Sequence, residues 1–358
     1  METKVGVIFK SYEPMQAIAA YAAATEAAGL AGGFWVAEAY HWFRNYGHEA
    51  RGAIATLANA IHATTTVPIG MGITSPYMRH PTIQASEAAA LDELSGGRFV
   101  MGLGAGKVGV NYLETNLKDA TPVKVHRESI AIVRGVLGGE AFSFSGDIYE
   151  ASVPAIAPDR HGHRTAIPIY IGATGPYMQR LAGEIADGLL LPGLTSPGFV
   201  RYSYENLNKG FARADRKPDD YPVGGVILCS VSEDGDKARN AARPYVATYV
   251  VNKIRNIQQD AILGKSGVTD EELVPMRQRI EAGNEDLVDL VGDDFMRRFT
   301  VVAGTPAECV DILQELVDAG LNLPLMEVVG DDVDANLETI RLLGAKVAPN
   351  LKPMRQAA

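Results

Sequence analysis

Residues 70–107 read GMGITSPYMRHPTIQASEAAALDELSGGRFVMGLGAGK, and no other stretch of the chain is as informative about its fold. An apolar, glycine-punctuated strand breaks at Ser75-Pro76, an alanine-rich helix follows, and a second apolar strand at 99–103 runs into Gly104-Ala105-Gly106. A strand, a helix and a strand joined by short connections form a parallel crossover unit. The carboxyl ends of parallel strands lie at one edge of their sheet, where such folds bind ligands. The two glycine-rich strand ends are therefore predicted to share a ligand site.

Strand and helix signals alternate outward from this unit over the whole chain. Apolar segments predict eight strands, at residues 5–9, 33–37, 68–73, 99–103, 168–171, 188–191, 223–231 and 323–329. Helical patterns lie between them, including 15–28, 49–63, 82–94, 125–137, 236–245 and the segment after Thr305, whose Glu308 has capping-box spacing. Eight strands alternating with helices favour an α/β fold of the (β/α)8 TIM-barrel type over an open doubly wound sheet.

Two segments depart from this alternation. Residues 141–149 (containing FSFSGDIY) are predicted to form a small hairpin, and residues from about 245 to 298 are helical and charged without a strand signal. The second segment is interpreted as a helical insertion after strand seven. The prediction is one barrel domain that covers residues 1–358.

Composition excludes several classes of partner. The chain has 33 Lys and Arg against 43 Asp and Glu, a net charge of −10, which argues against nucleic acid and anionic membranes as partners. Cys229 and Cys309 lie in no metal or redox spacing, so no metal site is expected and a reducing cytoplasm is the expected setting. The N-terminus lacks the shape of a signal peptide, and no apolar run reaches membrane-spanning length. These features predict a soluble cytoplasmic protein.

Six motifs spread over the chain resemble those of the luciferase-like flavin and deazaflavin oxidoreductases. They are GITSPYMRHP (72–81), LDELSGGR (91–98), GLGAG (102–106), IPIYIGATGP (167–176), AGEIADGLLL (182–191) and AGTPAECVDILQELVDAG (303–320). Within that family the chain looks most like the methylenetetrahydromethanopterin reductase branch, which uses the deazaflavin coenzyme F420. The resemblance implies a TIM-type barrel, hydride transfer to or from a small organic substrate, and a homodimer or higher homo-oligomer.

The resemblance also implies where the cofactor lies. A non-prolyl cis peptide bond between Gly72 and Ile73 is expected to bulge against the cofactor ring, and the turn Gly172–Gly175 to hold the cofactor phosphate. A helix N-terminus with free N–H groups suits such an anion, although a capped helix start beside an unoccupied turn is the alternative. Lys107 is either a phosphate contact or an exposed loop lysine. The predicted cofactor-binding residues are Gly72, Ile73, Thr74, Gly104, Ala105, Gly106, Lys107, Gly172, Ala173, Thr174 and Gly175.

The candidate catalytic residues are Glu38 and His41. Glu38 ends strand two, where burial can make a carboxylate a proton donor, and the aromatic-rich stretch that contains Tyr40 and His41 follows it. The family often has Asp-His here, so Glu38-Ala39 is a departure, and His41 or Tyr40 would replace the missing imidazole. A salt-bridged loop carboxylate is the alternative for Glu38. Arg79 and His80 are interpreted as structural residues that hold the loop or a subunit contact.

Strand one contains a second departure. The methanopterin reductases have a glutamate within this strand, near the pterin, and this chain has the apolar Ile8. An isoleucine cannot transfer a proton, so a substrate other than methylenetetrahydromethanopterin is expected.

Two other functions remain open from the sequence. One is an FMN-dependent luciferase-like monooxygenase, and the other is a catalytically idle flavin-binding barrel. The alanine-rich helices at 49–63 and 82–94 are expected to pack across a dimer axis, with packing inside one chain as the alternative.

Overall fold

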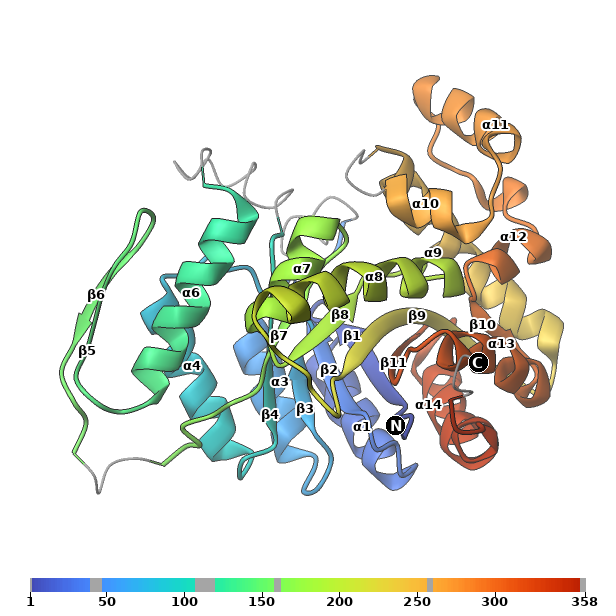
Figure 1. The fold of residues 1–358 in the computed structure, drawn as a ribbon. Helices are drawn as coiled ribbons and strands as arrows, with labels where there is room; N and C mark the ends of the chain where they lie inside the picture. Colours follow the sequence, from blue (N-terminus) through green and yellow to red (C-terminus); the bar gives the residue numbers. More distant parts are fainter. Residues whose placement is uncertain (1, 39–46, 107–119, 158–161, 256–259, 355–358) are drawn as a thin grey trace.

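The computed structural model describes residues 2–38, 47–106, 120–157, 162–255 and 260–354 (Figure 1). Eight parallel strands close into a barrel in the order β9-β11-β1-β2-β3-β4-β7-β8, and β8 pairs with β9. This closure confirms the predicted TIM-type barrel. The barrel strands are β1 (Gly6–Lys10), β2 (Gly33–Ala37), β3 (Ile69–Met71), β4 (Phe99–Gly104), β7 (Ile169–Gly172), β8 (Gly188–Leu191), β9 (Val223–Val231) and β11 (Leu323–Val328).

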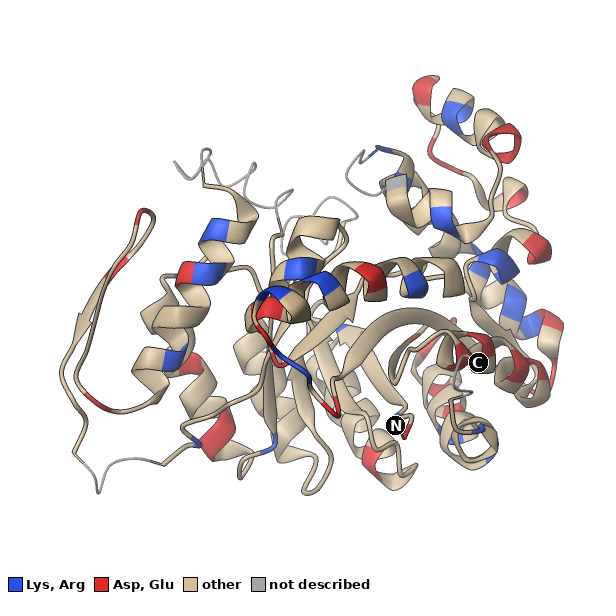
Figure 2. Cartoon of the chain, in the orientation of Figure 1, with Lys and Arg blue, Asp and Glu red and all other residues tan. Residues whose placement is uncertain are grey.

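Helices cover the outside of the barrel, and their N-termini carry the signals seen in the sequence. Thr305 and Glu308 form the predicted capping box of α13, and Thr121 and Ser196 cap α6 and α8 with their hydroxyls. The outer helices are α1 (Met15–Ala27), α3 (Ala53–His62), α4 (Pro81–Leu94), α6 (Pro122–Leu137), α7 (Pro176–Ile185), α8 (Pro197–Arg213), α13 (Pro306–Asp318) and α14 (Val333–Leu342), followed by the short turns η4 (Leu343–Val347) and η5 (Ala348–Asn350). Figure 2 places most charged residues on the helices and loops and few on the strands.

The segment after strand seven differs from its predicted bounds. The helix expected at 236–245 continues as α9 (Gly235–Arg255), so residue 245 is no boundary. The reason is packing, because Val246, Val250 and Val251 beyond this position are buried in the main core. The helices α10 (Asp260–Ser266), α11 (Asp270–Glu281), η3 (Val288–Leu290) and α12 (Asp293–Arg298) follow, and then β10 (Val302–Gly304), a strand not predicted, pairs with the end of β9.

The hairpin extends further than expected. Its strands are β5 (Phe142–Ser145) and β6 (Glu150–Val153), so the predicted segment 141–149 holds only one strand and the turn. The carboxylate of Glu128 on α6 fixes that turn by accepting hydrogen bonds from the N–H groups of Asp147, Ile148 and Tyr149, each at 3.0 Å.

The inside of the barrel is closed by apolar side chains. Ile8, Trp35, Tyr170, Leu190, Leu323 and Leu325 form one buried cluster. A Cβ at Gly70 would lie 2.1 Å from the Trp35 ring, so this position of β3 must be glycine for the indole to fit. The packed interior leaves no room for a ligand inside the barrel, and barrels of this type bind their ligands at the carboxyl ends of the strands.

Candidate active site

The ends of β2, β3 and β4 are joined by backbone hydrogen bonds around Gly72, Ile73 and Thr74. The Gly72–Ile73 bond is cis, at the position where the resemblance implies a cis bond. The N–H of Glu38 donates to the carbonyl of Ile73 at 3.1 Å, and the N–H of Thr74 donates to the carbonyl of Gly102 at 2.9 Å. These hydrogen bonds fix residues 72–74, which continue from the end of β3 to the barrel rim, against the neighbouring strands.

The side chain of Ile73 lies where two of the predicted cofactor-binding glycines have no side chain. A Cβ at Gly104 would lie 2.8 Å from Ile73 Cδ1, and a Cβ at Gly172 would lie 2.8 Å from Ile73 Cγ2. The space left by these glycines of β4 and β7 is therefore occupied by isoleucine, and a cofactor would meet Ile73 at this point. Three neighbouring strand ends are coupled through this one side chain.

Glu38 lies at the rim in a dense set of polar contacts. Its carboxylate accepts from Thr74 Oγ1 at 2.5 Å and from Arg79 Nη2 at 2.7 Å, and Arg79 also pairs with Glu87 at 3.1 Å. The Glu38 side chain is 7% exposed. The Glu38 carboxylate is thus anchored at the rim by a hydroxyl and a guanidinium. Its predicted role as a proton donor stays a prediction. It also gives Arg79 the structural role predicted for it.

The turn between β7 and α7 has the features of an anion site. Gly175 is the extended N-cap residue of α7, and no side-chain hydrogen bond caps this helix within the described residues. The first N–H groups of a helix have no partner inside the helix. A Cβ at Gly175 would meet nothing within 4 Å, so the space beside the turn is open. Gln179 donates to the carbonyl of Thr174 at 3.2 Å and fixes the turn from behind.

The end of β4 is ordered through a serine. Ser75 Oγ donates to the carbonyl of Ala105 at 3.1 Å, and Gly106 has a φ of 52°, a conformation that glycine adopts most readily. Gly106 is exposed. His41 and Lys107 lie outside the described residues, so their predicted roles stay predictions.

A cluster of polar side chains that was not predicted from the sequence lies at the ends of β1 and β11, beside α9. Lys10 at the end of β1 pairs with Glu327 of β11 at 2.5 Å, and the Tyr249 hydroxyl of α9 donates to Glu327 at 2.5 Å. Lys253 lies one helical turn further along α9, with its Nζ 5.6 Å from the Tyr249 ring centroid. A glutamate in the apolar strand LPLMEVVG was the available signal. Nothing local in the sequence indicates that α9 meets this strand.

Other residues considered in the sequence have structural positions. His80 caps α4, with its Nδ1 2.8 Å from Thr82 Oγ1. Cys229 and Cys309 are buried free thiols, and burial raises the pKa of both. No group of three or more His, Cys, Asp or Glu within the described ranges could hold a metal ion. In the same ranges, every helix is too short or too polar to cross a membrane.

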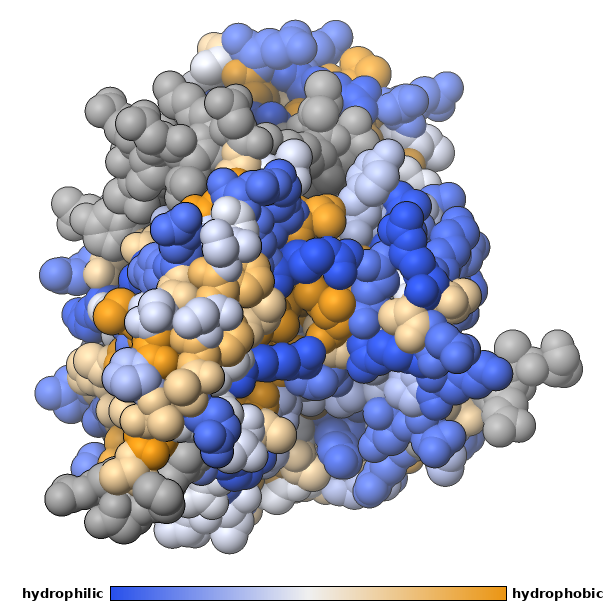
Figure 3. All heavy atoms as spheres, turned by 60° about the vertical axis from the view of Figure 1, so that its left-hand side comes forward, coloured by the Kyte–Doolittle hydropathy of each residue, from blue (hydrophilic) through white to orange (hydrophobic). Residues whose placement is uncertain are grey.

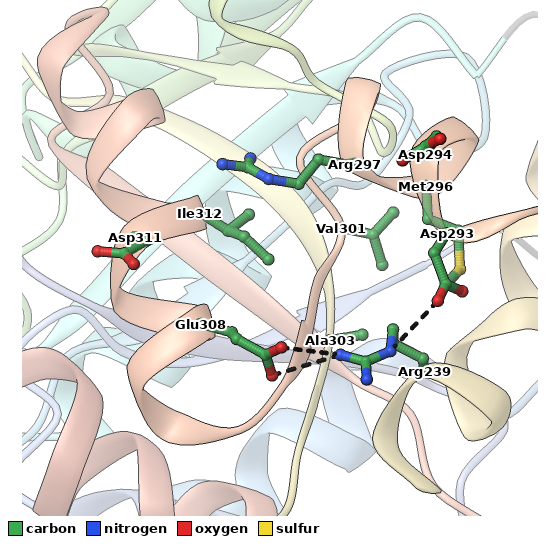
Figure 4. A pocket seen from close by; sticks show the side chains of 10 residues that line it. All are labelled: Arg239, Asp293, Asp294, Met296, Arg297, Val301, Ala303, Glu308, Asp311 and Ile312. Atoms are coloured by element: carbon green, nitrogen blue, oxygen red, sulfur yellow. Dashed lines mark hydrogen bonds and ion pairs between the residues drawn. The ribbon is translucent and has the colours of Figure 1, made fainter. Parts of the chain in front are cut away.

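A cleft on the outer side of the barrel is occupied by its own ion pairs (Figure 4). Arg239 of α9 pairs with Asp293 of α12 at 3.4 Å and with Glu308 of α13 at 3.2 Å. These contacts join the helices after β9 to the barrel. None of the described residues that line this cleft belongs to the strand ends above, and the cleft is interpreted as a structural contact.

Comparisons with known proteins agree with this geometry. The family model described as luciferase-like monooxygenase matches residues 2–323. The chain is 30% identical to 5,10-methylenetetrahydromethanopterin reductase of Methanolobus tindarius over 96% of this chain and 98% of that protein. It is 31% identical to the reductase of the same name from Methanopyrus kandleri over 89% of this chain and 90% of that protein.

A solved structure gives the same result for the fold. The coenzyme F420-dependent tetrahydromethanopterin reductase from Methanopyrus kandleri matches with a TM-score of 0.82 and 27% identity, over 98% of this chain and 100% of that one. The resemblance read from the motifs is thereby confirmed. The chain is an oxidoreductase and belongs to the luciferase-like monooxygenase family.

Proposed function

We propose that this protein is a coenzyme F420-dependent oxidoreductase that transfers a hydride to or from a small organic substrate. The observation that carries the proposal is the set of three adjacent strand ends, β3, β4 and β7, whose last inward residues are Gly72, Gly104 and Gly172, with an uncapped helix N-terminus beside them. A flat ring with a phosphate-bearing tail fits these features. The similarity to an F420-dependent reductase supports the same cofactor.

The predicted residues divide into two groups around such a cofactor. Gly72, Ile73 and Thr74, together with the segment 104–106, would contact the ring and the start of its tail. The turn 172–175 would hold the phosphate through backbone N–H groups and the Thr174 hydroxyl. Lys107 remains a proposed phosphate contact.

When bound, reduced F420 supplies a hydride, and the protein supplies position and electrostatics. The packed interior below the rim excludes water from the inner side of the site, because Trp35, Tyr170 and Leu190 fill it. We propose that Glu38 acts as an anchor that holds Thr74 and Arg79 at the rim. His41 is kept as a candidate proton donor.

The proposed substrate is not methylenetetrahydromethanopterin. Ile8 is 2% exposed and lies in the apolar cluster, and a Cβ at Gly72 would be 3.0 Å from its Cδ1. An apolar side chain therefore adjoins the cis bond where the methanopterin reductases have a glutamate. A hydride acceptor other than methylenetetrahydromethanopterin agrees better with the apolar Ile8 at this position.

The experiment that tests the function is a titration of the purified protein with F420 and, separately, with FMN. Micromolar binding of F420 without comparable FMN binding is expected, followed by oxidation of reduced F420 that does not need oxygen. Preferential FMN binding with oxygen-dependent turnover would establish the monooxygenase instead. Binding of either cofactor without turnover of any hydride acceptor would favour the idle barrel.

Cellular setting and assembly follow from other features. Two buried free thiols support a cytoplasmic location. We propose a homodimer through α3 and α4, because α4 exposes the large apolar side chains Ile83 and Leu94. One domain is proposed for the whole chain, with the helices after β9 as an insertion.

A further inference from the structure

The inward face of the barrel changes from apolar to charged at its rim on β1 and β11. Ile8 is in register with Glu327, and Gly6 with Leu325, so these positions share the inward face. Leu323, Leu325 and Ile8 belong to the interior cluster. Lys10 and Glu327 are the next inward residues toward the carboxyl ends, because side chains alternate with a period of two.

These two charges are withdrawn from solvent. The side chains of Lys10 and Glu327 are 11% and 6% exposed. An ion pair with so little exposure contributes weakly to stability, because desolvation offsets the attraction between the charges. Charged groups at the concave end of a barrel are therefore better explained by ligand binding than by folding.

Aromatic side chains hold the lysine in place. Its Nζ lies 5.6 Å from the Tyr12 ring centroid and 5.3 Å from that of Tyr249, and both rings attract a cation. The Tyr249 hydroxyl binds the second oxygen of Glu327. Tyr249 and Lys253 of α9 are four residues apart and share a helix face, so the helix after β9 forms the outer wall of this group.

The group adjoins the proposed cofactor platform. Ile8, two residues before Lys10 on the same face of β1, is the side chain nearest to a Cβ at Gly72. Lys10 is also in register with Ala37 of β2, the residue before Glu38. Of the two paired side chains, Lys10 is the more exposed, at 11% against 6% for Glu327, so it is the charge more open to a substrate beside the platform.

We propose that Lys10, positioned by Glu327 and Tyr249, is a substrate-binding residue that donates a hydrogen bond to the oxygen or nitrogen of a reducible C=O or C=N bond. This inference rests on the proposed hydride-transfer function and names its substrate class. Glu327 balances the charge of Lys10, so the pair suits a neutral carbonyl or imine better than a carboxylate or phosphate. Hydride addition from reduced F420 to such a carbon moves negative charge onto the attached heteroatom, which an ammonium stabilises until a proton from solvent completes the reduction.

The test compares an enone, whose carbonyl oxygen takes up the negative charge whether hydride adds at the carbonyl carbon or at the conjugated carbon, with a cationic acceptor that has no oxygen to take it up. The probes are cyclohex-2-enone and the triarylmethane cation crystal violet, and the variants are Lys10→Met, Lys10→Arg and Glu327→Gln. Lys346→Met is the matched control, since Lys346 pairs with Glu233 on the exposed surface.

Three measurements separate the outcomes. All variants are expected to bind F420 within about threefold of the wild type. With oxidised F420 bound, so that no hydride is available, Lys10→Met is expected to bind cyclohex-2-enone at least about tenfold more weakly, by saturation-transfer NMR. With reduced F420, enone reduction should fall about 100-fold while dye reduction stays nearly constant, and Lys10→Arg should recover part of the loss.

Each contrary result has one meaning. Intact F420 binding with unchanged enone affinity in Lys10→Met, or no enone binding by the wild type, overturns this inference alone. Equal losses for enone and dye assign Lys10 a structural role and also overturn it. Absence of F420 binding by the wild type overturns the proposed function, and the inference with it.

Discussion

At the scale of single residues, Lys253 lies in an environment that disfavours its charge. It is 3% exposed, beside the Tyr249 ring. Burial lowers its pKa from the ordinary 10.5 to about 7, although the nearby Glu327 acts in the opposite direction. Below the native pKa both the folded and the unfolded chain carry the proton, and folding then includes the full cost of burying the charge.

Lys253→Met is therefore expected to stabilise the protein most at low pH. Between about pH 7 and about pH 10.5 the unfolded chain binds a proton that the folded chain does not, so wild-type stability rises with pH across this window. The variant has no such pH dependence. Its advantage should therefore be a few kcal/mol near pH 6 and fall by about 1.4 kcal/mol for each pH unit between the two pKa values.

Denaturant unfolding of both proteins at several pH values measures the difference. Lys346→Met, at an exposed ion pair, should show almost no such trend. A variant that is less stable than the wild type near pH 6 would show that the Lys253 ammonium is favourably paired in the folded chain.

At the scale of one element, α7 combines a favourable start with an open N-terminus. Pro176 stands in its first turn and Gly175 is an extended N-cap without a side chain. An aspartate at this position would be a better cap, and its charge would also favour the helix dipole. The same charge would compete with a bound phosphate, so helix stability and cofactor binding should respond in opposite directions.

Gly175→Asp is expected to keep or raise the melting temperature and to weaken F420 binding by about tenfold or more, because an anion already occupies the N-terminus. Gly175→Ser is the matched control, since serine caps equally well without a charge. Calorimetry and F420 fluorescence titration give the two readouts. Equal F420 affinity in the aspartate and serine variants would show that the phosphate does not bind at this turn.

At the scale of the whole molecule, one face of the barrel exposes apolar residues. Figure 3 turns the side of the molecule that carries α4, α6 and the β5–β6 hairpin toward the viewer, and apolar residues gather on it. Ile83 and Leu94 of α4 are 53% and 48% exposed. An extended apolar area on a folded chain is a common feature of subunit interfaces.

The double variant Ile83→Asp, Leu94→Asp should convert the proposed dimer to a monomer, because two unpaired charges would be buried in the interface. Val333→Asp is the control, since Val333 is a 39% exposed apolar residue on α14. Size-exclusion chromatography with light scattering measures the mass. A double variant that remains dimeric would place the interface elsewhere. A monomeric wild type would exclude the proposed dimer.

Much of the fold followed from local patterns. The apolar strand segments and the Thr305 capping box are determined by neighbours in sequence, and the structure has them within a few residues of their predicted bounds. The α9 boundary was missed because Pro244 lies inside the helix, where a proline usually marks a helix end. β10 was missed because a strand of three residues leaves almost no periodic signal.

Local sequence patterns were enough to predict the alternation of strands and helices, and with it the rim where the glycine-rich strand ends lie. The side chains that meet at this rim are known only from the packing of distant elements. Ile73 fills the space beside Gly104 and Gly172, Arg79 pairs with Glu38, and Tyr249 contacts Glu327 across 78 residues of sequence. Periodicity records which face of an element is buried, because that depends on the residue itself. Which partner lies against that face depends on how distant elements pack, and no local pattern encodes it.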